Sequence, residues 1–135
     1  MLRRVALIAL TSFVVLACSD TTTPKDPLLG TWSLVTVSGQ PIPYILEQDA
    51  TRKVELTGET ITLLATGRQT MVTSFRVTDH GIVSLENVPS PGKYTVNGST
   101  VTISFDTDPD IYAAIVTGDT MRIDDIGLTF IYRRN

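Results

Sequence analysis

Apolar and polar residues alternate with a period of two from Leu28 onward, which is the pattern of β-strands that bury one face. The stretch Leu28–Val37 begins this pattern and holds the only tryptophan, Trp32. No later stretch keeps a helical period over three turns. The alternation therefore predicts one all-β domain over residues 28–135.

Turns rich in glycine divide this domain into short strands. A loop length is acceptable only if the apolar residues of both flanking strands fall on one face, because a slip of one residue reverses every side chain. Six loops satisfy this rule: Gly58-Glu59, Ala65–Gly67, Asp79–Gly81, Asn97-Gly98, Gly118-Asp119 and Asp124–Gly127. We therefore expect an antiparallel up-and-down meander of about 8–10 short strands, closed into a barrel because closure removes the exposed edges of the sheet.

The expected register sorts the side chains into an apolar inner face and a polar outer face. It pairs Ile61 with Met71 and Val116 with Met121, places Val83 and Leu85 inside, and points the carboxylates of Glu55, Glu59 and Glu86 outward. A neutral or weakly polar small ligand would suit an uncharged interior with tyrosine hydroxyls. The residues expected to contact it are Trp32, Leu34, Phe75, Tyr94, Phe105, Tyr112, Met121, Phe130 and Tyr132. The alternative is a lumen that the side chains fill completely.

One long connection, from Ser38 to Thr51, interrupts the short loops. Pro41 and Pro43 argue against a regular strand there, and Pro43 is suited to begin a short helical turn over residues 44–47. We expect a lid over the barrel mouth, formed by Tyr44, Ile45 and Leu46. The alternative is a plug that only seals the core.

The first 17 residues predict an export signal. Arg3 and Arg4 precede an apolar run of about a dozen residues, too short for a bilayer core of ~30 Å. The residues Val-Leu-Ala-Cys ending at Cys18 resemble the lipobox of bacterial lipoproteins. That resemblance implies cleavage before Cys18, acyl chains such as palmitate on its sulfur and amine, and membrane attachment. Ser19, rather than aspartate, then favours the outer membrane of a bacterial cell envelope. An ordinary secretory signal with an unrelated cysteine is the alternative.

Residues 18–27 have no apolar residue after the cysteine and predict a flexible tether. With Cys18 as the only cysteine, the chain cannot form an internal disulfide. Removal of residues 1–17 leaves nine basic and fourteen acidic residues without a basic cluster, so we expect no nucleic-acid partner.

No set of residues predicts catalysis. The only histidine, His80, lies in a turn with no nucleophile nearby, and no Ser-His-Asp, P-loop or dinucleotide motif occurs. Asp106, Asp108 and Asp110 have the spacing of a calcium loop, but that loop's glycine and glutamate are missing. We expect a protein that is not an enzyme and has no metal or cofactor.

The residues Gly30-Thr31-Trp32 resemble the G-x-W signature of lipocalins. Together with the hairpin around Asn97-Gly98 and the Tyr-Arg-Arg at 132–134, they make residues 28–135 similar to bacterial lipocalin-like domain lipoproteins. The resemblance implies a barrel that binds an apolar ligand, with Arg133 or Arg134 covering the tryptophan. The alternatives are a filled barrel that binds or inhibits an envelope protein through residues 87–92 and 106–110, and an inert barrel on a functional tether.

Overall fold

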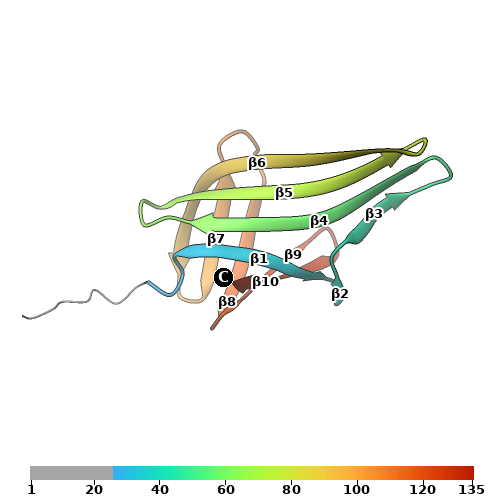
Figure 1. Ribbon diagram of the computed structural model, residues 1–135. Coiled ribbons are helices and arrows are strands. Elements are labelled where there is room, and N and C mark those ends of the chain that lie inside the picture. Colours follow the sequence, from blue (N-terminus) through green and yellow to red (C-terminus); the bar gives the residue numbers. More distant parts are fainter. Residues whose placement is uncertain (1–25) are drawn as a thin grey trace, which may run out of the picture.

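The computed structural model describes residues 26–135, and all of its regular secondary structure is β-strand (Figure 1). The predicted signal peptide, Cys18 and most of the predicted tether lie outside the described residues. Within the described part of the chain, no helix is long and apolar enough to cross a membrane. The strands are β1 (Gly30–Val37), β2 (Gln40–Pro41), β3 (Tyr44–Gln48), β4 (Arg52–Leu63), β5 (Arg68–Asp79), β6 (Ile82–Asn97), β7 (Thr100–Phe105), β8 (Ile111–Thr117), β9 (Thr120–Asp125) and β10 (Leu128–Arg134).

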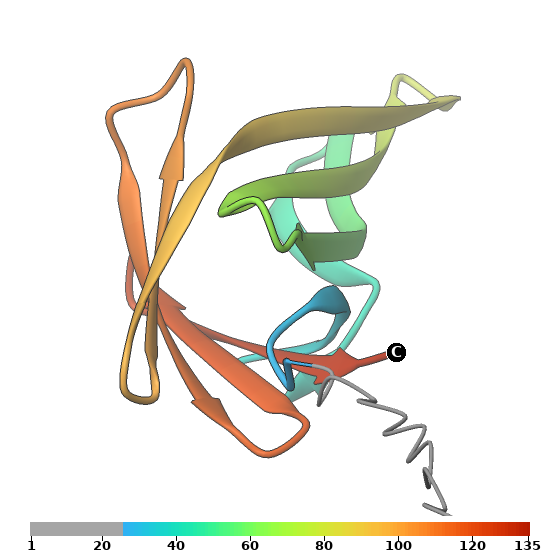
Figure 2. The ribbon, with the colours of Figure 1, turned by 90° about the vertical axis from the view of Figure 1, so that its left-hand side faces the viewer.

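Eight of these strands close into the antiparallel barrel that the alternation predicted (Figure 2). Consecutive strands pair from β4 to β10, and β10 then pairs with β1. The first half of β1 also pairs with the second half of β4, so Trp32 lies between Ile61 and Arg134 in the ladder. The two short strands β2 and β3 lie outside the ring, attached to β1 and β4.

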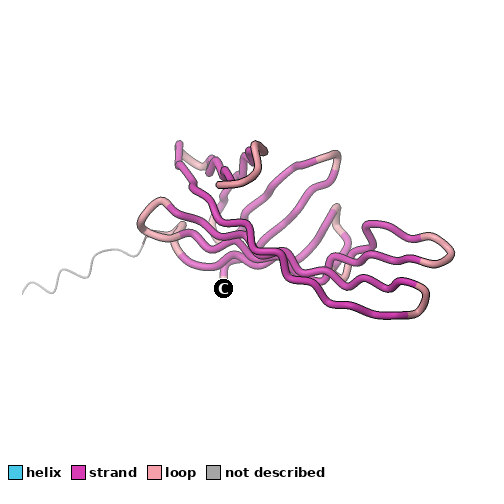
Figure 3. Tube along the Cα trace, turned by 90° about the horizontal axis from the view of Figure 1, so that it is seen from above, coloured by secondary structure: helices cyan, strands magenta, loops and turns pink. Residues whose placement is uncertain are grey.

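The strands β4, β5 and β6 are longer than predicted and continue beyond the barrel (Figures 1 and 3). We call this extension the arm: it consists of β3 with Arg52–Leu56, Phe75–Asp79 and Ile82–Glu86. In the arm β6 pairs with β5 alone, because its pairing with β7 begins only at Gly92. The arm therefore ends in a free edge on β6.

Gly92 marks the point where β6 gains its second neighbour. A Cβ atom at this position would lie 1.8 Å from the carbonyl oxygen of Ser104 and 2.8 Å from Nε2 of Gln69. Gln69 is itself buried, and its side chain donates a hydrogen bond of 3.2 Å to the same Ser104 oxygen. Three strands thus pack too closely here for any residue larger than glycine.

The predicted hairpin at Gly58-Glu59 is wrong, because β4 is one continuous strand. Leu56 pairs with Phe75 and Gly58 with Ser74, which leaves Thr57 as an extra residue in a β-bulge. The apolar residues on either side of Gly58 are out of phase, and either a turn or a bulge accounts for such a phase change. The consequence is that Glu59 joins Leu56 and Ile61 on the inner face.

The predicted three-residue turn at Asp79–Gly81 is also wrong. The turn is the dipeptide His80-Gly81, with φ angles of 47° and 82°, and Asp79 pairs with Ile82. Two positive φ angles suit the right-handed twist of a tight hairpin. The difference of one residue turns Val83 and Leu85 outward, where they are 58% and 74% exposed. It also puts Glu86 on the inner face, opposite Phe75.

Of the other four predicted loops, two are wrong in position or length and two are confirmed. Asn97 pairs with Thr100, so that turn is Gly98-Ser99 rather than Asn97-Gly98. Asp125 pairs with Leu128, so the last turn is Ile126-Gly127 rather than Asp124–Gly127. The remaining two loops have the expected register. Ile61 pairs with Met71 across the β4–β5 hairpin, and Val116 pairs with Met121 across the turn between β8 and β9.

The helical turn expected over residues 44–47 is wrong, because these residues form β3 and pair with β4. A strand at the edge of the sheet tolerates the preceding prolines, since its outer side needs no ladder partner.

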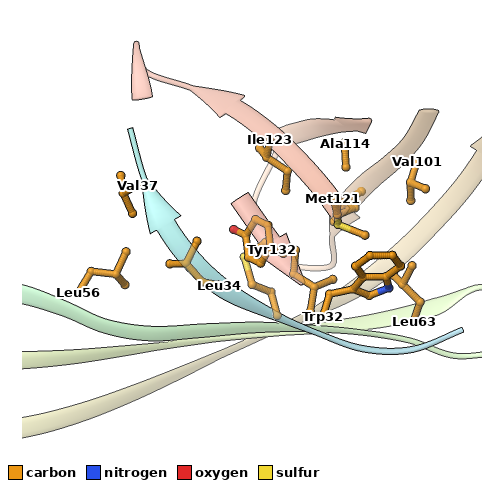
Figure 4. Close-up of a cluster of buried hydrophobic side chains, with 13 residues drawn as sticks. Trp32, Leu34, Val37, Leu56, Leu63, Val101, Ala114, Met121, Ile123 and Tyr132 are labelled. Atoms are coloured by element: carbon orange, nitrogen blue, oxygen red, sulfur yellow. The ribbon is translucent and has the colours of Figure 1, made fainter. Parts of the chain in front are cut away.

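One hydrophobic core lies inside the barrel (Figure 4). Val37 belongs to the core because β1 contains a second bulge, between Leu34 and Thr36, that reverses the alternation. The core consists of Trp32, Leu34, Val37, Leu56, Ile61, Leu63, Met71, Val101, Ile103, Ala114, Met121, Ile123 and Tyr132.

Candidate ligand-binding site

One end of the barrel is sealed around Trp32, which is fully buried. Its indole Nε1 donates a hydrogen bond of 3.1 Å to the carbonyl oxygen of Leu28. The guanidinium of Arg134 lies 6.0 Å from the centroid of the Trp32 ring, within the range of a cation–π contact. Arg134 also donates hydrogen bonds to the carbonyl oxygens of Pro27 and Leu29. Of the two candidate arginines, Arg134 is therefore the one that covers the tryptophan.

A cavity of about 290 Å³ lies toward the opposite end, where every strand from β4 to β10 and the loop between β7 and β8 contribute to its wall. Aromatic rings make up much of its wall, and the rings of Phe105 and Tyr112 meet edge to face with centroids 5.4 Å apart. The remaining wall is formed by methionine, isoleucine, small polar and acidic side chains. The lining residues are Glu59, Met71, Thr73, Phe75, Ser90, Phe105, Thr107, Asp108, Tyr112, Ile123, Asp125, Phe130 and Tyr132.

The structure divides the nine predicted ligand-contacting residues into two groups. Trp32, Leu34 and Met121 are buried in the core, and Tyr94 donates a hydrogen bond to the carbonyl oxygen of Leu64 in the β4–β5 loop, so these four do not line the cavity. The five that line it are Phe75, Phe105, Tyr112, Phe130 and Tyr132.

Glu59 is the site residue that the alternation placed on the wrong face. It lines the cavity, where the hydroxyl of Thr73 donates a hydrogen bond of 2.6 Å to Oε2 and the hydroxyl of Tyr132 donates one to Oε1. The bulge at Thr57 turns Glu59 inward. A glycine inside a long strand pattern, here Gly58, is a known sign of a bulge and is the signal that would have revealed this residue.

The two tyrosine hydroxyls of the cavity stay protonated. Burial raises the pKa of Tyr132 far above its usual range, and the charge of Glu59 and the hydrogen bond to it raise it further. Burial also raises the pKa of Tyr112, followed by the negative charges of Asp125 and Asp110. Both groups therefore act as neutral hydrogen-bond donors.

The predicted lid residues lie at the edge of the arm, on β3. Tyr44 is partly buried and packs against the core, while Ile45 and Leu46 are 48% and 44% exposed. They form neither a helical turn nor part of the cavity wall.

The remaining candidate residues lie in exposed turns and loops. His80 occupies its turn with Nδ1 2.6 Å from the Asp79 carboxylate. Asp106 forms an ion pair with Arg68, and the Asp108 carboxylate accepts a hydrogen bond of 2.9 Å from the backbone of Asp110. Over residues 26–135, no three His, Cys, Asp or Glu side chains come together in a way that could hold a metal ion.

A family model described as a lipocalin-like domain matches residues 28–123. The match spans more than half of the chain and agrees with the closed barrel, so this chain belongs to the lipocalin-like domain family. A comparison with curated proteins finds no match.

Proposed function

We propose that this protein binds a small, largely apolar ligand inside its barrel. The supporting observation is the cavity of about 290 Å³ with aromatic walls, set against an opposite end that Trp32 and Arg134 seal. Its volume is near the lower end of the ~300–1,000 Å³ of typical ligand pockets. Burial of the ligand's apolar surface, at about 25 cal/mol per Å², supplies the affinity.

A fluorescence titration with the neutral apolar dye N-phenyl-1-naphthylamine tests this proposal. Ser90 lines the cavity from β6, whereas Ser84 occupies an inner-face position on the same strand in the arm, outside the cavity. We expect saturable binding by the wild type and by Ser84→Trp, and loss of binding in Ser90→Trp. If the wild type binds neither the dye nor any component of a broad lipid extract, the proposal fails.

Membrane attachment through Cys18 forms the second part of the proposal. The support is the sequence pattern alone: a basic start, a short apolar run and a single cysteine at the expected cleavage position. In a bacterial host, Cys18→Ala should move the protein from the membrane fraction to the soluble fraction and abolish labelling with radioactive palmitate. Unchanged fractionation and labelling would argue against acylation.

A protein-binding role is the second candidate, favoured by the free edge of β6. Ile82, Val83 and Leu85 are all more than half exposed on this edge strand. An extended segment of an envelope protein that added to the edge would cover them. A pull-down from envelope extract that compares the wild type with Leu85→Lys tests this role. A protein that binds the free edge should be retained by the wild type and not by the variant. If both retain the same proteins, the edge is not the binding surface. Residues 87–92, expected as a contact loop, are part of β6.

A further inference from the structure

The charges lining the cavity are all negative. Glu59, Asp108 and Asp125 line it, and no lysine, arginine or histidine does. None of these three carboxylates forms a salt bridge within the described part of the chain, although five lysine or arginine ion pairs with other carboxylates exist there. This arrangement contradicts the uncharged interior expected from the alternation, and it disfavours a ligand that carries a carboxylate.

Glu59 is held in place but its charge is not neutralised. Its two hydrogen-bond donors, the hydroxyls of Thr73 and Tyr132, are both neutral. An ionised carboxylate can accept about four hydrogen bonds, so acceptor capacity remains on the cavity side. The two bonds come from different strands, β5 and β10, and they fix the carboxylate's orientation.

The wall around this carboxylate also suits a cation. Phe75, Phe105, Tyr112 and Phe130 supply aromatic rings, whose negative faces attract a positive group within about 6 Å of their centroids. The same rings provide apolar surface for the rest of the ligand. A carboxylate and several aromatic rings that line one cavity are a combination that recognises a protonated amine.

We propose that the cavity selects a small cationic amphiphile, a protonated amine attached to an apolar or aromatic body, with Glu59 as its counter-charge. The amine donates hydrogen bonds to the free positions of Glu59, and its body packs against the phenylalanine rings. Asp108 and Asp125 at the cavity wall add to the negative potential that attracts the cation. This inference rests on the proposed ligand-binding function and specifies its ligand class.

Two matched ligand series test the proposal by titration calorimetry on the purified full chain. One series is tryptamine, tryptophol and indole-3-acetate; the other is octylamine, octanol and octanoate. In each, the body is constant while the head group is cationic, neutral or anionic. We expect the amine to bind about tenfold tighter than the alcohol, because a hydrogen bond to a charged group is worth more than a neutral one. The acid should bind most weakly.

Glu59→Gln keeps the size of the side chain while removing the charge. Its carbonyl oxygen still accepts a hydrogen bond from one of the two hydroxyls, and its NH2 group can donate to the oxygen of the other. The substitution should abolish the preference for the amine, so that the Kd values of the amine and the alcohol come within about twofold of each other. The matched control is Glu47→Gln, which removes the same charge from an exposed position on β3 outside the cavity. It should behave as the wild type, and circular dichroism verifies that both variants are folded.

The outcomes separate this inference from the function on which it rests. Equal or tighter binding of the alcohol or the acid, or an amine preference that survives Glu59→Gln, overturns the cationic ligand class and leaves the ligand-binding function intact. Binding of N-phenyl-1-naphthylamine without binding of either amine has the same meaning. If neither the dye nor any member of the two series binds, both proposals fail.

Discussion

The two ends of the barrel differ in how their interiors are filled. At the sealed end, Trp32 is fully buried, and the surrounding strands follow the predicted alternation. At the other end, a bulge in β4 brings the charged Glu59 inside and a cavity remains. The sealed end is thus organised for stability. The cavity end gives up packing density, which close-packed interiors avoid unless the space has a use.

Truncation of Trp32 should cause the largest loss of stability. A smaller loss than at the cavity end would contradict the idea that the sealed end is the more closely packed one. We expect Trp32→Ala to lower the free energy of unfolding by about 4 kcal/mol, since it opens a large void among fully buried neighbours. Phe130→Ala, on the partly buried cavity wall, should cost about half as much. Urea denaturation measures both values. Equal losses would show that the two ends are packed alike.

Gly92→Ala tests the close packing where β6 meets β7. Its Cβ would overlap the Ser104 carbonyl oxygen, so we expect a loss of about 3 kcal/mol in the free energy of unfolding. Gly58→Ala is the matched control within the same sheet, because the nearest atom to its Cβ would be 3.9 Å away. The control should change the unfolding midpoint little. A tolerated Gly92→Ala would mean that β6 can shift relative to β7.

Arg134→Gln should have an intermediate effect on the sealed end. It removes the cation above Trp32 and the guanidinium hydrogen bonds to two carbonyl oxygens, a loss of about 1–2 kcal/mol. Arg133 is exposed, and Arg133→Gln should change stability by less than about 0.5 kcal/mol. Thermal unfolding of the two variants measures this difference. Similar shifts in Tm for Arg134→Gln and Arg133→Gln would mean that the contact of Arg134 with Trp32 does not contribute to stability.

The arm should show the smallest effect, and one that depends on pH. Arg76 donates a hydrogen bond of 2.7 Å to Glu55 and Lys53 lies 3.2 Å away, which lowers the pKa of Glu55 from 4.5 to about 2. A lowered pKa stabilises the folded state above pH 4.5, and this stabilisation disappears as the pH falls toward 2. Glu55→Gln should therefore be less stable than the wild type at pH 7, and the difference should shrink below pH 4.5 and nearly vanish at about pH 1, as measured by urea unfolding. If the difference in unfolding free energy between the wild type and Glu55→Gln did not change with pH, the ion pairs of Glu55 would not contribute to stability.

The sequence was sufficient for the parts of the fold where alternation is uninterrupted. The β8–β9 hairpin, the pairing of Ile61 with Met71 and the burial of Trp32 follow from apolar positions alone. The cavity was harder, because its decisive residue, Glu59, depends on one extra residue at Thr57. A bulge and a hairpin both reverse the alternation, and only long-range pairing with β5 distinguishes them. At His80, likewise, a turn of two residues instead of three reversed the predicted faces of Val83 and Leu85.

The ring is closed by strands far apart in the sequence, and this affects how the barrel can form during synthesis. Ser33 of β1 donates a hydrogen bond to Asn135, 102 positions later. On the ribosome, β1 can pair with β4 early, but its other edge must wait for β10, and contacts of such separation form slowly. Two chains emerging side by side during strong expression have time to exchange their first strands, so a strand-swapped dimer is the misfolded product to look for in overproducing cells.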